Sequence, residues 1–201
     1  MALDSFTPEQ IAALLIATSF AAGLNTYATG ATLGLLERFG AIALPPALEP
    51  LASWWVIGAC LALFTVEFFA DKVPAFDLVW NALHTFVRVP AGALLAWAAA
   101  TPLSPEQQLM AALAGAGLAF LAHAGKMAAR AAVTPSPEPL SNTGLSLAED
   151  AVAIGLTWFA TTHPLIAAFI VLVFVVMIVV VIRVAWRALR ALFRGARRRL
   201  A

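Results

Sequence analysis

Residues 165–182 read LIAAFIVLVFVVMIVVVI, an apolar run without a single charged side chain. About 20 such residues in a helix cross the hydrocarbon core of a bilayer, so this run predicts a lipid-facing transmembrane helix. The whole chain agrees, because 62% of its 201 residues are hydrophobic and 11% are charged, against about 25% charged residues in a soluble domain. The sequence therefore predicts an integral membrane protein and excludes a soluble globular fold.

Proline and N-cap residues divide the chain into helices. Thr7-Pro8-Glu9 and Ser104-Pro105-Glu106 each combine a hydroxyl N-cap, a proline at the first helical position and an acid in the first turn. The length leaves room for about six spans of about 20 residues. We therefore expect an all-α, polytopic membrane protein with about six transmembrane helices. The expected helices cover residues 8–36, 50–71, 76–100, 105–131, 143–162 and 164–194.

Short motifs recur in the same order in the two halves of the chain. PALEPL at 46–51 is followed much later by PSPEPL at 135–140, and a Phe-Ala-x-x-x-Pro pattern occurs in both halves. Three spans per copy would force the copies into opposite orientations, an arrangement common in secondary transporters. We expect a 3+3 inverted repeat with copies at 1–103 and 104–194, and chance similarity in an Ala/Leu-rich chain is the alternative.

Basic residues predict the orientation. The tail 183–201 holds seven Arg and no acid, which predicts a cytoplasmic segment that binds the lipid bilayer through anionic headgroups. Six spans then place the N-terminus in the cytoplasm as well. Residues 1–10 lack Lys and Arg, so we expect the first apolar segment to be retained rather than cleaved. We expect a multi-pass protein of the bacterial inner membrane, with no nucleic-acid partner and with homo-oligomerisation open.

Polar residues at membrane depth are costly and are functional candidates by default. In this chain they recur at spacings of three and four residues, so they share helix faces. The stripes are Asp77, Asn81, His84 and Arg88; His123, Lys126 and Arg130; Thr18, Asn25, Thr29 and Thr32; Glu67 and Asp71; and Asn142, Ser146, Glu149 and Asp150.

Depth along the helices groups some of these residues. At about 1.5 Å per residue, Asn25, Arg88 and Asp150 lie at similar depth in the cytoplasmic half of the membrane. An unpaired Arg88 would cost several kcal/mol there, so we expect an acidic partner. Asp150 or Glu149 is our first choice and Glu67 the second.

Two sets of candidate residues follow. The predicted substrate-binding residues are Asn25, Tyr27, Arg88, Asn142, Glu149 and Asp150. The predicted proton-coupling or charge-network residues are Glu67, Asp71, Lys72, Asp77, His84, His123, Lys126 and Arg130. For Asp71, Lys72, Lys126 and Arg130, a purely structural or topological role is the alternative.

No catalytic, cofactor or thiolate motif is found. The chain has no His-Glu-x-x-His, no Gly-x-Ser-x-Gly and no phosphate-binding glycine loop. Cys60 is the only cysteine, which excludes an intrachain disulfide. A metal site using His84, His123 and Glu67 is an alternative, but we expect neither a metal nor a cofactor.

Three segments carry a family resemblance. They read SFAAGLNTY at 19–27, EFFADKVPAFDLVWNALHTFVRVPAG at 67–92 and SPEPLSNTGLSLAED at 136–150. Together they resemble the domain of unknown function 4126 family of small bacterial membrane proteins. In that family an Arg often directly precedes the proline, whereas here Val89 separates Arg88 from Pro90. The resemblance implies a membrane fold and no activity.

These observations favour a small transporter or facilitator, not an enzyme. Its substrate would be an anionic or zwitterionic solute or lipid headgroup, because Arg88 provides a buried cation, and Glu67 or Asp150 could couple protons. Two alternatives stay open. One is a non-transporting membrane scaffold with a structural polar network, and the other is a membrane-embedded lipid-modifying enzyme.

Overall fold

The computed structural model is all-α and describes residues 7–72, 74–133 and 139–200. The side chains of 73–78, 131–142, 185, 188, 189 and 191–200 lie outside that description. Eight helices are found in the described ranges. They are α1 (Pro8–Leu24), α2 (Thr26–Arg38), the 3-10 helix η2 (Pro46–Ala52), α3 (Trp54–Ala70), α4 (Pro74–Ala99), α5 (Pro105–Val133), α6 (Pro139–Thr162) and α7 (Pro164–Leu200).

Helices α1 and α5 start after the predicted N-caps, Thr7 and Ser104, and each start forms a capping box with a glutamine. The Thr7 side chain accepts a hydrogen bond from Gln10 N, and the Gln10 side chain accepts one from Thr7 N at 2.9 Å. Ser104 and Gln107 make the same reciprocal pair before α5. Each box satisfies two backbone donors that a helix start would leave unpaired.

The first apolar segment differs from the single helix expected over 8–36. Asn25 adopts an extended backbone (φ −150°, ψ 103°) that ends α1, and its side chain accepts from Ala28 N at 2.9 Å to cap α2. Asparagine is a favoured N-cap because its side chain replaces the missing intrahelical partner of such a donor. One residue therefore turns the segment into two helices.

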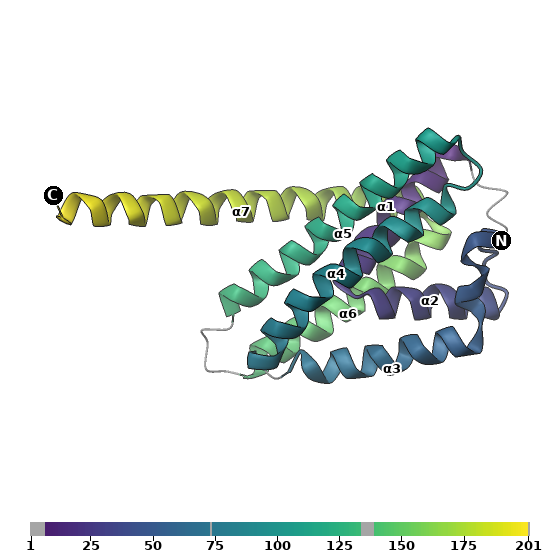
Figure 1. Cartoon of the computed structure of the whole chain (residues 1–201), viewed down its shortest axis with the longest axis horizontal. Helices are drawn as coiled ribbons and strands as arrows, with labels where there is room; N and C mark the ends of the chain where they lie inside the picture. The colour runs from purple at the N-terminus through teal and green to yellow at the C-terminus, as the bar shows by residue number, and fades with distance from the viewer. Residues whose placement is uncertain (1–6, 73, 134–138, 201) are drawn as a thin grey trace.

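Helices α1 and α2 form a hairpin with Asn25 at its tip (Figure 1). Gly30 of α2 lies against the Cys60 sulfur, and Gly34 lies against the Leu51 carbonyl, so α2 runs back along α3 toward η2. Leu48 of η2 packs against the cluster that contains Leu15 of α1 and also against the one that contains Leu33 of α2. Helix α2 therefore returns to the end of the bundle where α1 began.

Glycine and alanine join α1, α4 and α5 in one half of the bundle. A Cβ on Gly115 would lie 2.5 Å from both the Ala96 Cβ and the Gly92 carbonyl oxygen, and a Cβ on Gly23 would lie 2.3 Å from the Ala119 carbonyl oxygen. Small residues let helix backbones approach this closely, as is common between membrane helices. These contacts fix α1 on the α4–α5 pair.

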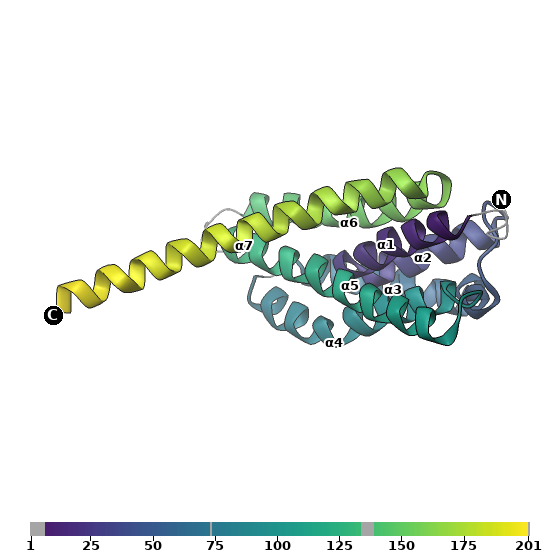
Figure 2. The ribbon, with the colours of Figure 1, turned by 90° about the horizontal axis from the view of Figure 1, so that it is seen from above.

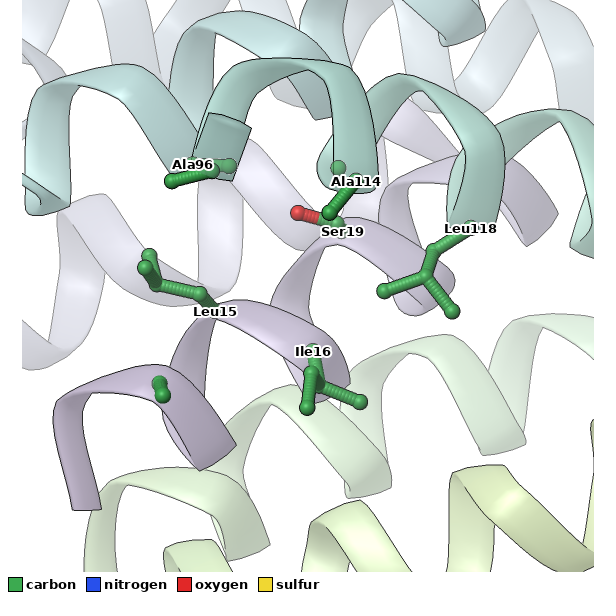
Figure 3. A pocket seen from close by; sticks show the side chains of 9 residues that line it. Leu15, Ile16, Ser19, Ala96, Ala114 and Leu118 are labelled. Carbon is green, nitrogen blue, oxygen red and sulfur yellow. The ribbon is translucent and has the colours of Figure 1, made fainter. Parts of the chain in front are cut away.

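A shallow apolar pocket of about 190 Å³ lies on this interface. Figure 3 shows the Leu15, Ile16 and Leu118 side chains around it, with the Ser19 hydroxyl directed toward α4 and α5. Ser19 donates to the Gly92 carbonyl at 3.1 Å, so its hydroxyl is satisfied. The pocket is therefore lined by apolar side chains and one satisfied hydroxyl.

Helix α7 covers one side of the bundle and then extends beyond it (Figures 1 and 2). Ala167 and Val171 are buried in the main apolar core, whereas most of its other large side chains are exposed. That exposure matches the lipid-facing helix expected from residues 165–182. Its C-terminal end and the start of α1 lie at opposite ends of the molecule.

Several helices are long and apolar enough to span a membrane. They are Val79–Ala99 of α4, Pro105–Arg130 of α5 and Pro164–Val184 of α7, with a fourth span if η2 and α3, bent by 66°, count as one. We expected six spans, and the described residues contain three or four candidates. In the described ranges the N-terminal half contains a hairpin and a bent pair, while the C-terminal half has three continuous helices, so no inverted repeat is shown.

Candidate functional site

A cluster of charged side chains lies inside the bundle, and we call it the ion-pair network. It draws on α3 and its C-cap, α4, α5 and α6, and its members are at most 8% exposed. The stripes predicted from the sequence therefore do face one another. The network consists of Glu67, Asp71, Arg88, His123, Lys126, Arg130, Glu149 and Asp150.

Arg88 is completely buried near the centre of α4. Its Nη2 pairs with Glu67 Oε1, and its Nη1 donates to His123 Nδ1 at 2.7 Å. Because that nitrogen accepts, the Nε2–H of His123 donates to Thr85 Oγ1 at 2.9 Å. The expected pairing of Arg88 with Asp150 or Glu149 is wrong, and the second choice, Glu67, is the partner.

Lys126 and Arg130 lie one turn apart on α5 and link two acids on different elements. Lys126 Nζ lies 3.1 Å from Asp71 Oδ2 and 3.3 Å from Glu149 Oε2. Arg130 Nη2 contacts the same two oxygens at 2.8 and 2.7 Å. These cations hold the end of α3 against α6, and Lys126 also reaches Glu67 at 3.4 Å.

The tip of the α1–α2 hairpin reaches the network. Asn25 Nδ2 donates to Asp150 Oδ1 at 2.9 Å, and Lys126 Nζ donates to the Leu24 carbonyl at 3.5 Å. Asn25 is completely buried and Asp150 is 5% exposed. The prediction that Asn25 and Asp150 lie at the same depth is confirmed, while their role in binding a substrate stays a prediction.

Tyr27 and His84 form a separate pair beside the tip. Tyr27 Oη donates to His84 Nε2 at 3.1 Å, and His84 Nδ1 donates to the Trp80 carbonyl at 2.8 Å. The two rings meet edge to face, with centroids 5.6 Å apart. Tyr27, expected in the substrate site, is therefore bonded to a histidine of α4.

Lys72 contacts Phe68 beside the ion-pair network. Its Nζ donates to the Phe68 carbonyl at 2.7 Å and lies 3.0 Å from the centroid of the Phe68 ring. Desolvation lowers the pKa of the Lys72 ammonium, against the opposing fields of Asp150 and Asp71. Asp77 and Asn142, also predicted site residues, have side chains outside the described residues.

Thr85 and the Leu24 carbonyl join the site without having been predicted. Thr85 lies three residues before Arg88 on the same helix face, so the spacing rule could have found it. The Leu24 carbonyl leaves no such signal, because it is exposed only by the break at Asn25.

The network contains one more acid than it has cations. Four carboxyl groups face three cationic side chains, and the fourth carboxyl, Asp150, accepts a hydrogen bond from the neutral amide of Asn25. Among the described residues, Asp150 Oδ2 and Ser146 Oγ have no hydrogen-bond partner, although both are buried. The described residues contain no group of three His, Cys, Asp or Glu suited to a metal ion. The ion-pair network could therefore accept one further positive charge at Asp150.

Comparison with known proteins gives a family and no activity. The model of DUF4126, a domain of unknown function, matches residues 12–184. The chain therefore belongs to this family, as its sequence motifs predicted. No curated protein and no solved structure matches it.

Proposed function

We propose that this member of the DUF4126 family is a small inner-membrane transporter or facilitator for an anionic or zwitterionic solute or lipid headgroup. The observation that carries the proposal is the hairpin tip at Asn25, where a helix breaks inside the bundle beside buried charges. Non-helical backbone at membrane depth is tolerated where protein buries it or where it lines a cavity. Discontinuous helices of this kind form the substrate sites of many transporters.

The charge distribution supports one orientation. Lys126 and Arg130 lie toward the end of the bundle from which the Arg-rich end of α7 extends, and the positive-inside rule assigns that end to the cytoplasm. In this proposal the α1–α2 hairpin enters from the opposite face. The N-terminus is then outside, in place of the cytoplasmic location expected from six spans. The tail 183–201 would bind anionic headgroups.

A cavity at the outer end supports access to the hairpin. Its volume is about 740 Å³, and it lies between the start of α1, the segment before η2 and the α4–α5 turn. Ile11, Leu44 and Pro102 give it apolar walls, while Glu49 and Thr101 supply polar groups. The cavity lies at the open end of the hairpin, so a solute bound there would still have to move along α1 to reach Asn25.

Arg88 would bind the anionic group of the substrate only by exchanging partners. Its guanidinium is held by Glu67 and His123, so a phosphate or carboxylate must replace Glu67. Arginine forms planar, bidentate pairs with such groups, so the guanidinium would keep an anionic partner throughout the exchange. The released Glu67 carboxylate would remain 3.4 Å from Lys126.

Reconstituted vesicles test the proposal. Vesicles loaded with a pH-sensitive dye would be given inorganic phosphate, phosphoethanolamine or glycine betaine under a pH gradient, and a second set would carry fluorescent phosphatidylglycerol. We expect at least one probe to cross faster than in protein-free vesicles, and Arg88→Lys to slow it. Equal rates in wild-type and protein-free vesicles for all four probes contradict transport.

The scaffold alternative is favoured by one observation, the pairing of every cationic side chain in the network. A structural network would tolerate charge removal by matched apolar pairs. A folded Glu67→Leu, Arg88→Met double variant that retains wild-type growth in a strain requiring the protein would support the scaffold. Loss of growth with normal folding would support transport.

A further inference from the structure

We propose that Asp150 and Ser146 bind one monovalent cation, delivered as a proton or as Na⁺, at the tip of the α1–α2 hairpin. The shared chemistry is a single positive charge on a buried carboxylate. The site deepens the proposed function, because it would supply the coupling ion. Binding itself is independent of transport and can be measured without a substrate.

The first argument is charge balance. Glu67, Asp71 and Glu149 each contact a cationic side chain within 3.4 Å, whereas Asp150 accepts a hydrogen bond from the neutral amide of Asn25. An uncompensated charge in an apolar interior is strongly unfavourable. One bound cation at Asp150 would balance the four carboxylates of the network against its three cationic side chains, with Lys72 adding a more exposed positive charge outside it.

The second argument is the pair of unsatisfied oxygens. Asn25 occupies Oδ1 of Asp150, and Oδ2 has no partner among the described residues. Ser146 lies one turn earlier on α6, is completely buried, and its hydroxyl is likewise unpaired in that part of the chain. Side chains four residues apart share a helix face, so the two oxygens are available to one cation.

Neighbouring elements determine the field at Asp150. Lys126 on α5 opposes cation binding, whereas Glu67 of α3 and Asp71 at its end favour it. Lys72 in the α3–α4 turn acts on Asp150 from outside the network. The remaining charged groups of the cluster are Arg88 on α4, Arg130 on α5 and Glu149 on α6, and they are paired as described.

Glu67 is therefore not the coupling acid. Its Oε1 contacts both Arg88 and Lys126, so protonating Glu67 would leave two buried cations without that partner. Protonating Asp150 breaks no ion pair. The ion pairs therefore favour Asp150 over Glu67 as the coupling acid.

Carbodiimide labelling of the wild-type protein tests the site directly. Dicyclohexylcarbodiimide adds to protonated carboxyls in apolar surroundings, and peptide mass spectrometry locates the adduct. In detergent micelles with choline chloride we expect labelling at Asp150 that increases as the pH falls, and none at Glu67. Labelling at Glu67 with Asp150 unmodified overturns the proposal.

Adding Na⁺ distinguishes a site that binds Na⁺ from one that binds only a proton. If Na⁺ binds, replacing choline by Na⁺ slows labelling of Asp150, and Ser146→Ala weakens this protection, whereas Ser53→Ala leaves it intact. If only a proton binds, Na⁺ has no effect. Both outcomes support a cation site, and they identify its occupant.

Stability provides a second measurement with a defined sign. A folded state that holds one proton more than the unfolded chain loses stability as the pH rises, by about tenfold in the unfolding equilibrium constant per pH unit. Na⁺ binding gives the equivalent dependence on Na⁺ concentration. Asp150→Asn, which keeps the hydrogen bond to Asn25, should abolish the dependence, whereas Glu49→Gln at the exposed η2 should not.

Two results would overturn the proposal. One is identical dependence on pH and Na⁺ in wild type and Asp150→Asn. The other is an absence of carbodiimide labelling at Asp150 under all of these conditions. If Asp150 binds a cation but no probe crosses reconstituted vesicles, the cation site stands and the transport proposal fails. If probes cross and Asp150→Asn transports with unchanged pH dependence, the transport proposal stands and the cation site fails.

Discussion

The same helices α1, α4 and α5 pack by two different means along their length. Beyond the middle of α1 they meet through Ser19, Gly92 and Gly115, with backbones almost in contact. At the hairpin tip Gly23 keeps the backbone of α1 equally close to Ala119 of α5, but the buried charged side chains of Arg88 and Lys126 also lie there. The close backbone contacts of the first region either form or are lost, whereas the charged side chains of the second can exchange one hydrogen-bond partner for another. This contrast places any moving or ion-binding part at the tip.

The largest expected effect is on the charged region. Glu67→Gln removes the carboxylate from Arg88 and should destabilise the protein by about 3–5 kcal/mol, because a buried cation loses its partner. Denaturation in mixed detergent and SDS micelles measures this change. The matched double variant Glu67→Leu, Arg88→Met should recover most of the stability. A double variant as unstable as the single one would show that the network contributes more than mutual charge compensation.

The closely packed region should respond to added volume. Gly115→Ala places a Cβ 2.5 Å from the Ala96 Cβ and the Gly92 carbonyl, and we expect a loss of about 1–3 kcal/mol from overpacking. Gly117, two residues later on the same helix, has open space around its ideal Cβ. Gly117→Ala should therefore stabilise α5 by up to about 1 kcal/mol, through helix propensity. Equal effects at the two positions would contradict the asymmetry of the interface.

The sequence predicted most of the local structure and half of the site's geometry. Helix starts at Thr7 and Ser104 were predictable, because capping boxes depend on adjacent residues. The shared depth of Asn25 and Asp150 was predictable as well, because the rise per residue is fixed. Both inferences use distances along one helix.

The hairpin and the partner of Arg88 could not be obtained in that way. Thr18, Asn25 and Thr32 follow a continuous helical spacing, and only the packing of α2 against α3 shows that the helix ends at Asn25. Arg88 pairs with Glu67 and not with Asp150. A long side chain can reach partners at several levels of the bundle, so the rotation of each helix about its axis determines which partner it meets. Rotation and helix direction depend on tertiary contacts absent from a linear reading.

The hairpin tip should show an intermediate effect. Asn25→Ala removes the cap of α2 and the hydrogen bond to Asp150, and loss of an N-cap alone costs about 0.5–2 kcal/mol. Thr7→Ala removes a cap at an exposed helix start and provides the matched control. We expect only Asn25→Ala to change carbodiimide labelling of Asp150. Unchanged labelling would separate the cap from the proposed cation site.

The smallest effect should come from Ser19, whose hydroxyl is the polar group labelled in Figure 3. Ser19→Ala removes a buried hydrogen bond to the Gly92 carbonyl but keeps the close approach of α1 and α4. Hydrogen bonds between membrane helices contribute about 0.6 kcal/mol on average, so the unfolding midpoint should move only slightly. A loss as large as that of Gly115→Ala would mean that the Ser19 hydroxyl holds this region together. In that case the region around Ser19 and the region at the hairpin tip would both depend on specific polar contacts. They would then differ only in whether those contacts are charged.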